Sequence, residues 1–569
     1  MDIDNELTLL LTKVTNLPED QVRELVEIPP DPSLGDRAFP CFRLAKMFKK
    51  SPVIIASELA KQLEDSFRSN PDSIFRKVEA VKAYINFFVD EGKLSAYTVR
   101  KILTEAQTYG DKPQTNETVV VESPSPNTNK PLHLGHLRNI AIAESMCRVF
   151  ESQGFDVKRV NLFNDRGVHI CKSMLAYKRW GENKQPDKKS DHFVGDYYVL
   201  FSQKAADDPN LEDEAKEMLR DWEAGDPEVL QLWELMNNWA YEGFEQTFER
   251  FGVSYDQYYY ESQVYREGRD IILKGLEEGR FFRHDSGAVI ADLGQPLGEK
   301  VLLRSDGTSV YITQDIYLAK KKYDDFHYAQ SIYVVASEQN YHFQVLFKLV
   351  EKLGFEFSDR LHHLSYGMVY LPEGKMKSRE GTVVDADDLL DQVQQMALEE
   401  CQDRFSSDVA ESIATRVALA AVKYYILKFT APKDFTYNPK EAISFEGDTG
   451  PYLLYSYVRA NRIIEKFGEK PTSEVDYGLL THQTEAQLVK ELYSFPQVLE
   501  SATRQYAPHL VSQYAFKLAT QFSMFYEKCR VIGAESPDLG RARLALVGGY
   551  RIVIRKCLTL LGIEPVEAM

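Results

Sequence analysis

The chain has 569 residues, which is enough for three or four domains with large cores. Its composition, 44% hydrophobic and 27% charged, is that of an ordinary globular protein. It contains no apolar run of about 18 residues, so we expect no membrane span and no membrane partner. The N-terminus, M-D-I-D-N-E-L, lacks the basic and apolar regions of a signal peptide, and we therefore expect a cytoplasmic protein.

A net charge of −18 argues against a nucleic-acid partner, because phosphates are neutralised by clustered lysine and arginine. The last thirty residues are locally more basic, with Arg541, Arg543, Arg551, Arg555 and Lys556. Six cysteines form no C-x-x-C pair, which argues against both a zinc site and a disulfide framework. We expect buried thiols and no bound zinc or other metal.

Residues 1 to about 110 have the pattern of a small α+β domain. Val81–Val89 predicts a strand on which Tyr84 and Asn86 share one face, because side chains two apart point the same way. On the residues alone, this is an exposed polar pair on an edge strand.

The stretch 118–138 joins a predicted buried strand, Thr118–Glu122, to a helix that starts near His136 and ends before Gly154. A strand end that turns into a helix N-terminus directs backbone N–H groups and a positive dipole at a nearby anion. His133 and His136 bracket Gly135, where the backbone can approach a ligand closely. The stretch therefore predicts a phosphate site.

Further strands and helices alternate downstream, as in an open α/β sheet. Strands are predicted at 156–163 and 332–336 and a helix at 341–353, with a mostly helical, polar insertion from about 172 to 290. Tyr311 and Asp315 lie one helical turn apart, and Gln339 follows a strand end. An Asp at 315 could also simply favour the helix dipole.

A second cationic stretch follows a strand-like segment, residues 364–371. The loop Gly374-Lys-Met-Lys-Ser-Arg-Glu-Gly381 carries Lys375, Lys377 and Arg379. Such loops are usually solvated, but this one should leave the carboxyl end of a strand, where open α/β sheets bind ligands. Residues 385–440 and 441–569 are predicted to be helical, the latter with helices at 451–467, 485–505, 508–529 and 539–561.

The stretches around His133 and Lys375 resemble the HIGH and KMSKS signatures of class I aminoacyl-tRNA synthetases. The run E-S-P-S-P-N-T-N-K-P-L-H-L-G-H-L-R-N is similar to that of arginyl-tRNA synthetases. The resemblance implies a doubly wound, Rossmann-like α/β catalytic domain with a small α+β domain before it and an all-α anticodon-binding domain after it. The implied boundaries are 1–110 for a tRNA D-loop-recognition domain, 111–384 for the catalytic domain, 385–440 for a helical stem-contact region and 441–569 for the anticodon-binding domain.

The family's reaction is ATP-dependent ligation of L-arginine to tRNA(Arg) through an arginyl-adenylate. The resemblance implies that ATP, as its Mg²⁺ complex, binds at His133, Gly135, His136, Met368, Val369 and Lys375. Lys377 and Arg379 would join Lys375 in serving the departing pyrophosphate. The second lysine of KMSKS falls on Ser378 here, and Lys130, shortly before the first histidine, is the candidate substitute.

The arginine side chain would be recognised by Glu122, Tyr311 and Asp315, because carboxylates suit the planar guanidinium. By the same resemblance, the α-amino and carboxylate groups would meet Ser125, Asn127 and Gln339. Tyr84 and Asn86 would contact the D-loop of the tRNA, and we expect a monomer. Alternatives are a cysteinyl or glutamyl synthetase, or a catalytically silent paralogue that binds tRNA; the absent Cys/His zinc ligands, the acids Glu122 and Asp315, and the intact HIGH stretch speak against them.

Overall fold

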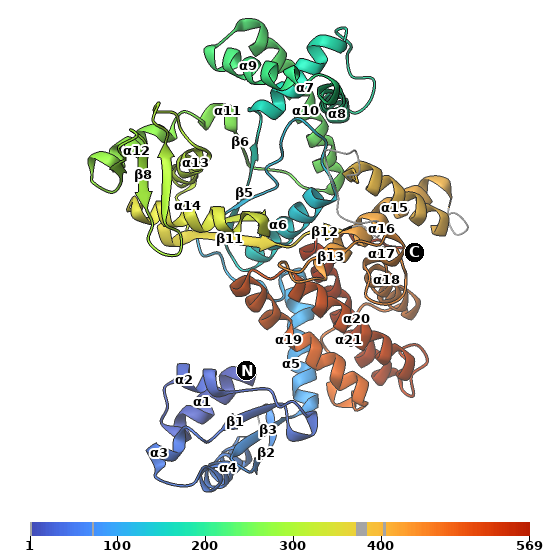
Figure 1. The fold of residues 1–569 in the computed structure, drawn as a ribbon. Helices are drawn as coiled ribbons and strands as arrows, with labels where there is room; N and C mark the ends of the chain where they lie inside the picture. Colours follow the sequence, from blue (N-terminus) through green and yellow to red (C-terminus); the bar gives the residue numbers. More distant parts are fainter. Residues whose placement is uncertain (1–2, 71–72, 371–383, 402–405) are drawn as a thin grey trace. The chain divides into compact units, whose positions relative to one another are not determined.

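The computed structural model describes residues 3–70, 73–370, 384–401 and 406–569 (Figure 1). These residues form two compact units, each drawn from several stretches of the chain. One unit consists of Met1–Tyr109, Arg459–Phe495 and Leu518–Val553; the other consists of Gly110–Val458, Pro496–Lys517 and Ile554–Met569. The α/β sheet and the candidate catalytic residues lie in the second unit.

A five-stranded parallel sheet forms the centre of the second unit, in the order β11-β10-β4-β5-β6. The strand that comes first in the chain lies in the middle, and the chain then builds outward on one side before it returns to the other. The carboxyl ends of β4 and β10 therefore flank the topological switch point, where such sheets bind ligands. The strands are Thr118–Glu122 (β4), Asp156–Phe163 (β5), Gln257–Tyr260 (β6), Gln330–Ala336 (β10) and Leu361–Tyr366 (β11).

Three helices position the candidate site on this sheet. Helix α6 (Leu134–Ser152) follows β4, α13 (Tyr311–Phe326) precedes β10, and α14 (Asn340–Lys352) connects β10 to β11. The predicted strands 118–122 and 156–163 are confirmed, and Gly154, at φ +87°, follows the end of α6 as expected. A strand–turn–helix unit thus carries both histidines.

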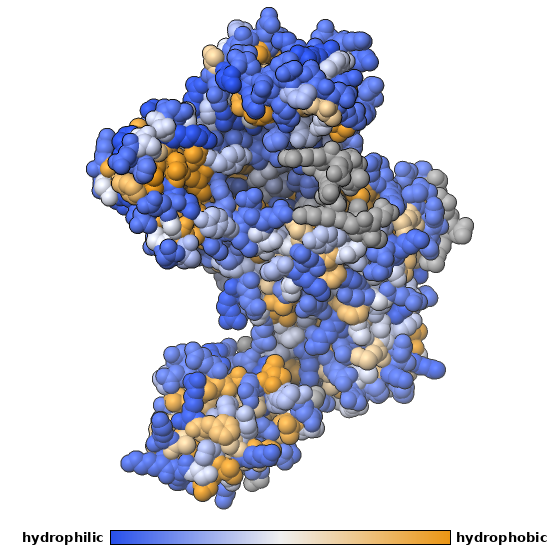
Figure 2. Space-filling model, viewed as in Figure 1, coloured by the Kyte–Doolittle hydropathy of each residue, from blue (hydrophilic) through white to orange (hydrophobic). Residues whose placement is uncertain are grey.

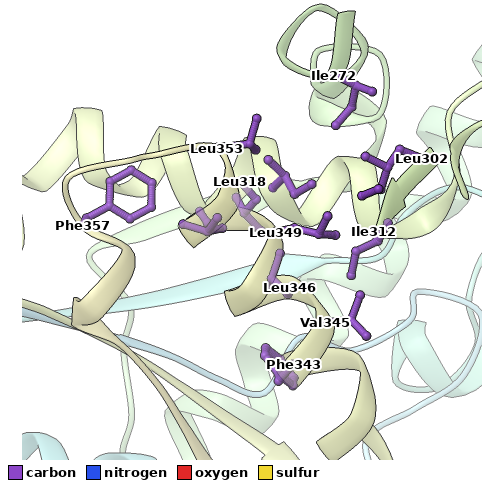
Figure 3. Close-up of a cluster of buried hydrophobic side chains, with 14 of the residues drawn as sticks. Ile272, Leu302, Ile312, Leu318, Phe343, Val345, Leu346, Leu349, Leu353 and Phe357 are labelled. Atoms are coloured by element: carbon purple, nitrogen blue, oxygen red, sulfur yellow. The ribbon is translucent and has the colours of Figure 1, made fainter. Parts of the chain in front are cut away.

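A large hydrophobic cluster holds α13 and α14 together. Along α14, Phe343, Leu346, Leu349 and Leu353 recur at helical spacing and are buried. Figure 3 shows these side chains in one cluster with those of α13, α12 (Gly268–Glu277) and β9 (Glu299–Leu303). The polar residues of α13 are therefore displayed from a well-packed helix.

The predicted insertion forms a helical cluster with its own core, built from α7 (Val168–Trp180), α8 (Ser190–Asp207), α9 (Asn210–Ala224) and α10 (Pro227–Phe251) (Figure 1). Strand β6 also lies within the stretch 172–290, yet it pairs with β5 in the main sheet. Its sequence, Q-Y-Y-Y, lacks the β-branched run that indicated the other strands. After it come α11 (Glu261–Val264), α12 and an antiparallel sheet of β7 (Phe282–Arg283), β8 (Val289–Asp292) and β9.

The predicted strand 364–371 is two strands in different sheets. β11 ends at Tyr366, and β12 (Val369–Tyr370) pairs with β13 (Phe435–Thr436). The break lies at Gly367, where a Cβ atom would come within 2.4 Å of the Asp434 carboxylate. The helices that follow are α15 (Ala386–Cys401), α16 (Ser407–Leu427) and α17 (Pro439–Ala442).

The N-terminal domain contains an antiparallel sheet of order β1-β3-β2. The predicted strand 81–89 is the end of β2 and all of β3, separated by a turn at Lys82 with φ +54°. Because β3 is the central strand, the interpretation of Tyr84 and Asn86 as an edge-strand pair is wrong. The elements are α1 (Ile3–Thr15), α2 (Glu19–Leu25), β1 (Arg37–Pro40), α3 (Leu44–Phe48), α4 (Pro52–Ser69), β2 (Phe75–Val81), β3 (Tyr84–Val89) and α5 (Glu91–Glu105).

The last 120 residues are helical, close to the predicted bounds: α18 (Gly450–Phe467), α19 (Gln483–Gln505), α20 (His509–Lys528) and α21 (Pro537–Leu560). Several of the terminal basic residues are neutralised by acids. Arg541 pairs with Glu469, Arg543 pairs with the buried Glu485, and Lys556 pairs with Asp111. The positive charge of these three residues is therefore balanced by neighbouring acids. Among the helices that the structure describes, none is long and apolar enough to cross a bilayer.

Candidate active site

The two histidines are built into the N-terminus of α6. His133 is the N-cap residue, and its Nδ1 accepts the N–H of Gly135 at 3.1 Å, while Nδ1 of His136 accepts the N–H of His133 at 3.1 Å. The rings stack with their centroids 3.9 Å apart. Because each Nδ1 accepts a backbone hydrogen, each neutral ring carries its proton on Nε2, from which it can donate to a phosphate oxygen.

Burial keeps both imidazoles neutral. It lowers the pKa of His133 to about 3, with a further contribution from the charge of Lys130, and it lowers the pKa of His136 well below its usual value. Burial also lowers the pKa of Lys130. Among the described residues, Lys130 is the cation whose charge contributes to the low pKa of both histidines.

A cavity of about 190 Å³ opens beside Lys130 and His133. Asp196 and Tyr198 of helix α8 in the insertion, with Lys188 just before that helix, also line it. The insertion therefore contributes directly to the surroundings of the candidate phosphate residues.

Three potential metal ligands lie beside this cavity, since ligand atoms of His192, Asp385 and Asp387 fall within 4.8 Å of one another. The ammonium of Lys189 is 2.9 Å from Asp387 and already balances that carboxylate. Asp385 also caps α15 by accepting the N–H groups of Asp387 and Asp388. The group therefore acts as an ion-pair network between the insertion and α15.

The backbone on either side of Asp385 is bonded to the turn that carries His133. Leu134 donates its N–H to Val384, and Ala386 donates its N–H to Leu132. The predicted cations Lys375, Lys377 and Arg379, and Ser378 with them, lie outside the described residues.

The predicted adenine segment is held by a buried arginine from α6. Arg138, 1% exposed, donates to the carbonyls of Gly367 and Met368 and also to those of Ala431 and Lys433. The N–H of Met368 donates to Asp434, while Val369 is buried at the start of β12. Arg138 thus ties the histidine-bearing helix to the predicted adenine segment.

The predicted guanidinium pocket contains acids that are already paired with bases. Glu122, 6% exposed at the end of β4, accepts a hydrogen bond from Lys322 at 2.7 Å. Asp315, one turn after Tyr311 on α13, lies 2.6 Å from Nε2 of His342 on α14. Tyr311, at the start of α13, is 61% exposed, and the charges of Glu261 and Asp315 act on it.

A third acid, Glu261, was not predicted. It follows the last residue of β6, is 5% exposed and lies 3.8 Å from Arg166. Burial, with smaller contributions from Asp165 and Asp315, raises its pKa to about 7, although Arg166 acts against this. A buried acid with a strongly raised pKa is a mark of a functional site. The strand-end rule would have identified Glu261 if β6 had been predicted.

The remaining predicted arginine ligands lie along the same edge of the sheet. Ser125, at φ +56°, places its hydroxyl 3.4 Å from Glu122. Asn127 is exposed and forms a bridge with Asn164 beyond β5, and Gln339 is exposed after β10. The structure therefore brings Ser125 to Glu122. It places Asn127 and Gln339 at the ends of their strands, where no hydrogen bond among the described residues joins either of them to Glu122.

On the N-terminal domain, Tyr84 and Asn86 share one face of β3, as predicted. Asn86 is only 3% exposed, whereas Tyr84 is half-buried and packs edge-on against Phe42, with ring centroids 5.6 Å apart. Figure 2 shows hydrophobic residues gathered on the visible face of this domain. Its exposed apolar residues include Phe42, Met47, Val53 and Ile54.

Comparison with protein families identifies this combination of sheet, turn and histidines. A family model described as the catalytic domain of class I tRNA synthetases (R) matches residues 98–438. Further models match residues 2–89, as the arginyl-tRNA synthetase N-terminal domain, and 453–569, as the DALR anticodon-binding domain. The fold is that of a class I aminoacyl-tRNA synthetase.

Comparison with individual proteins shows which synthetases of this class the chain resembles. The chain is 44% identical to the arginine–tRNA ligase of Treponema denticola, over 96% of this chain and 94% of that one. It is 42% identical to the arginine–tRNA ligase of Parabacteroides distasonis, over 93% and 92%. The arginyl-tRNA synthetase of Thermus thermophilus superposes with a TM-score of 0.82 at 25% identity over all of both chains. The chain belongs to the arginyl-tRNA synthetase family, which confirms the resemblance and the expected fold class.

Proposed function

We propose that this arginine–tRNA ligase uses the residues at the carboxyl edge of its sheet as follows. The enzyme joins ATP, L-arginine and tRNA(Arg) to give AMP, diphosphate and L-arginyl-tRNA(Arg). The observation that carries the assignment of the site is the convergence of Glu122, Asp315 and Glu261 at the ends of β4 and β6 and on α13. Buried carboxylates at one edge suit a cationic substrate side chain.

Activation is an in-line attack of the arginine carboxylate on the α-phosphate, so the protein mainly positions reactants and balances charge. The Nε2–H groups of His133 and His136 and the N-terminus of α6 donate to phosphate oxygens. Lys130 supplies positive charge there, while Lys375, Lys377 and Arg379 serve the departing pyrophosphate. ATP enters as its Mg²⁺ complex, with adenine beside Met368 and Val369, and we propose no zinc or tightly bound cofactor.

Arginine lies with its guanidinium toward Asp315, Glu261 and Tyr311. Its α-amino and carboxylate groups face Ser125, Asn127 and Gln339, and Glu122 contributes negative charge between the two ends. Neutral citrulline would bring no positive charge to this group of acids, and the loss of that charge–charge interaction gives strong discrimination without an editing site.

The other regions serve the tRNA. We propose D-loop recognition by 1–110, stem contacts by 385–440 and anticodon binding by 441–569, around a catalytic domain of 111–384 with its insertion near 172–290. We further propose a cytoplasmic monomer. Because Asn86 is 3% exposed, we assign the stacking surface to Tyr84, with Asn86 as the neighbouring polar group.

Pyrophosphate exchange with all twenty amino acids tests the assignment. We expect exchange with arginine alone and only when tRNA is present, because the pocket selects a cation and the family generally requires tRNA. Exchange with cysteine or glutamate but not arginine would show a different specificity, and exchange with none would indicate a silent paralogue.

The Lys130→Ala variant tests the source of positive charge near the histidines. We expect arginyl-adenylate formation to slow by roughly two to three orders of magnitude, the loss of one well-placed charge on a transferring phosphoryl group. Arginine binding should barely change. Single-turnover rates provide the measurement, and Ser378→Lys in the Lys130→Ala background should restore part of the rate. A near-normal rate in Lys130→Ala would contradict the assignment.

The Tyr84→Ala variant tests the N-terminal domain. Base stacking is worth about 1–3 kcal/mol, so kcat/KM for tRNA should fall about five- to a hundredfold while the KM for ATP stays the same. Asn86→Ala should cost less because Asn86 is buried. Combining Tyr84→Ala with a D-loop-substituted tRNA completes a double-mutant cycle, and fully additive losses would show that Tyr84 does not contact that loop.

A further inference from the structure

The closest ion pair of Glu122 joins it to a residue for which the proposed mechanism has no role. Nζ of Lys322 lies 2.7 Å from Oε2 of Glu122, and the lysine side chain is 0% exposed. The other oxygen, Oε1, lies 3.4 Å from the hydroxyl of Ser125. The arginine site therefore contains a fixed positive charge of the protein's own.

Lys322 is surrounded by the walls of the same pocket. Its ammonium lies 3.7 Å from the ring centre of Tyr333, the residue of β10 that pairs with Glu122 across the sheet. The charge of Asp315, two turns earlier on α13, also acts on this ammonium. The preceding lysines behave differently, since Lys320 and Lys321 are about 40% exposed and pair with surface aspartates. Lys322 alone of these three points into the sheet edge.

Burial lowers the pKa of Lys322, and the neighbouring acids Glu122 and Asp315 act in the opposite direction. A buried ammonium is costly to desolvate unless an opposite charge accompanies it. The converse also holds: without Lys322, Glu122 would be a buried carboxylate with no cation in contact. The orientation of the Glu122 carboxylate therefore depends on Lys322.

We propose that Lys322 is a positioning residue for arginine recognition: by pairing with Oε2 of Glu122 it fixes the orientation of that carboxylate, so that Oε1, beside the Ser125 hydroxyl, is the oxygen that faces the substrate. The inference rests on the proposed placement of arginine against Glu122. With one carboxylate oxygen toward the substrate, Glu122 can accept a hydrogen bond from it at that oxygen only. Asp315 and Glu261 provide the remaining negative charge for the guanidinium. Lys322 thereby reduces the negative charge that the pocket presents to the substrate.

Loss of this cation should appear in the binding of arginine. Glu122 also acts electrostatically on Tyr333 of β10 and Tyr259 of β6, and neither tyrosine can replace the lost positive charge. In Lys322→Met the buried Glu122 carboxylate would lose its ion pair and the contact that orients it. Affinity for arginine should therefore fall.

The experiment measures the KM for arginine and kcat by pyrophosphate exchange with saturating tRNA. In Lys322→Met we expect a KM about tenfold or more above wild type and little change in kcat. Lys322→Arg should restore the wild-type KM because it keeps the charge. Lys320→Met, which removes an exposed lysine of the same helix, is the matched control and should match wild type.

Two further variants separate the possible failures. If Glu122→Gln leaves the arginine KM unchanged, the proposed placement of arginine against Glu122 is wrong. If Glu122→Gln raises the KM but Lys322→Met has the wild-type KM, the role of Lys322 is overturned. The double variant Lys322→Met/Glu122→Gln removes both buried charges, so it should fold even if Lys322→Met does not. Its KM should equal that of Glu122→Gln because Lys322 acts through Glu122, and a further increase would also overturn the inference.

Discussion

Buried carboxylates are stable only beside positive charge, and this constraint organises the carboxyl edge of the sheet. Glu122 pairs with Lys322 and Glu261 pairs with Arg166, while Asp315 is in hydrogen-bond contact with His342. These residues come from α13, α14, the end of β4 and the segments that follow β5 and β6. Binding of a guanidinium adds a further cation to a set of acids that the protein has only partly balanced.

The phosphate side of the site follows the opposite rule. There the histidines are kept neutral by burial and oriented by the backbone of α6, and the formal charge comes from Lys130. Arg138 donates hydrogen bonds to four backbone carbonyls and thereby holds the segment that contains Met368 in place. One strand–turn–helix unit therefore carries both the acid Glu122, at the end of β4, and the two histidines, at the start of α6.

The sequence predicted the parts of the site that local pattern determines. The β-branched run of β4, the start of α6 and the one-turn spacing of Tyr311 and Asp315 are all present. Glu261 was missed because β6 is a short aromatic strand inside an otherwise helical stretch. Lys322 was not predicted, since it ends a run of three lysines and only tertiary packing turns it inward. Likewise, the burial of Asn86 follows from the central place of β3, which pairing and not local sequence decides.

Proton release on arginine binding tests most directly whether the substrate completes a partly balanced set of acids. Burial raises the pKa of Glu261 to about 7, and a bound guanidinium should lower it again. Calorimetric titration with L-arginine in buffers of different ionisation enthalpy should therefore show about half a proton released per arginine at pH 7, because a group at its pKa is half protonated. The release should shrink as pH rises and disappear in Glu261→Gln. Identical binding heats in all buffers at pH 7 would contradict the account.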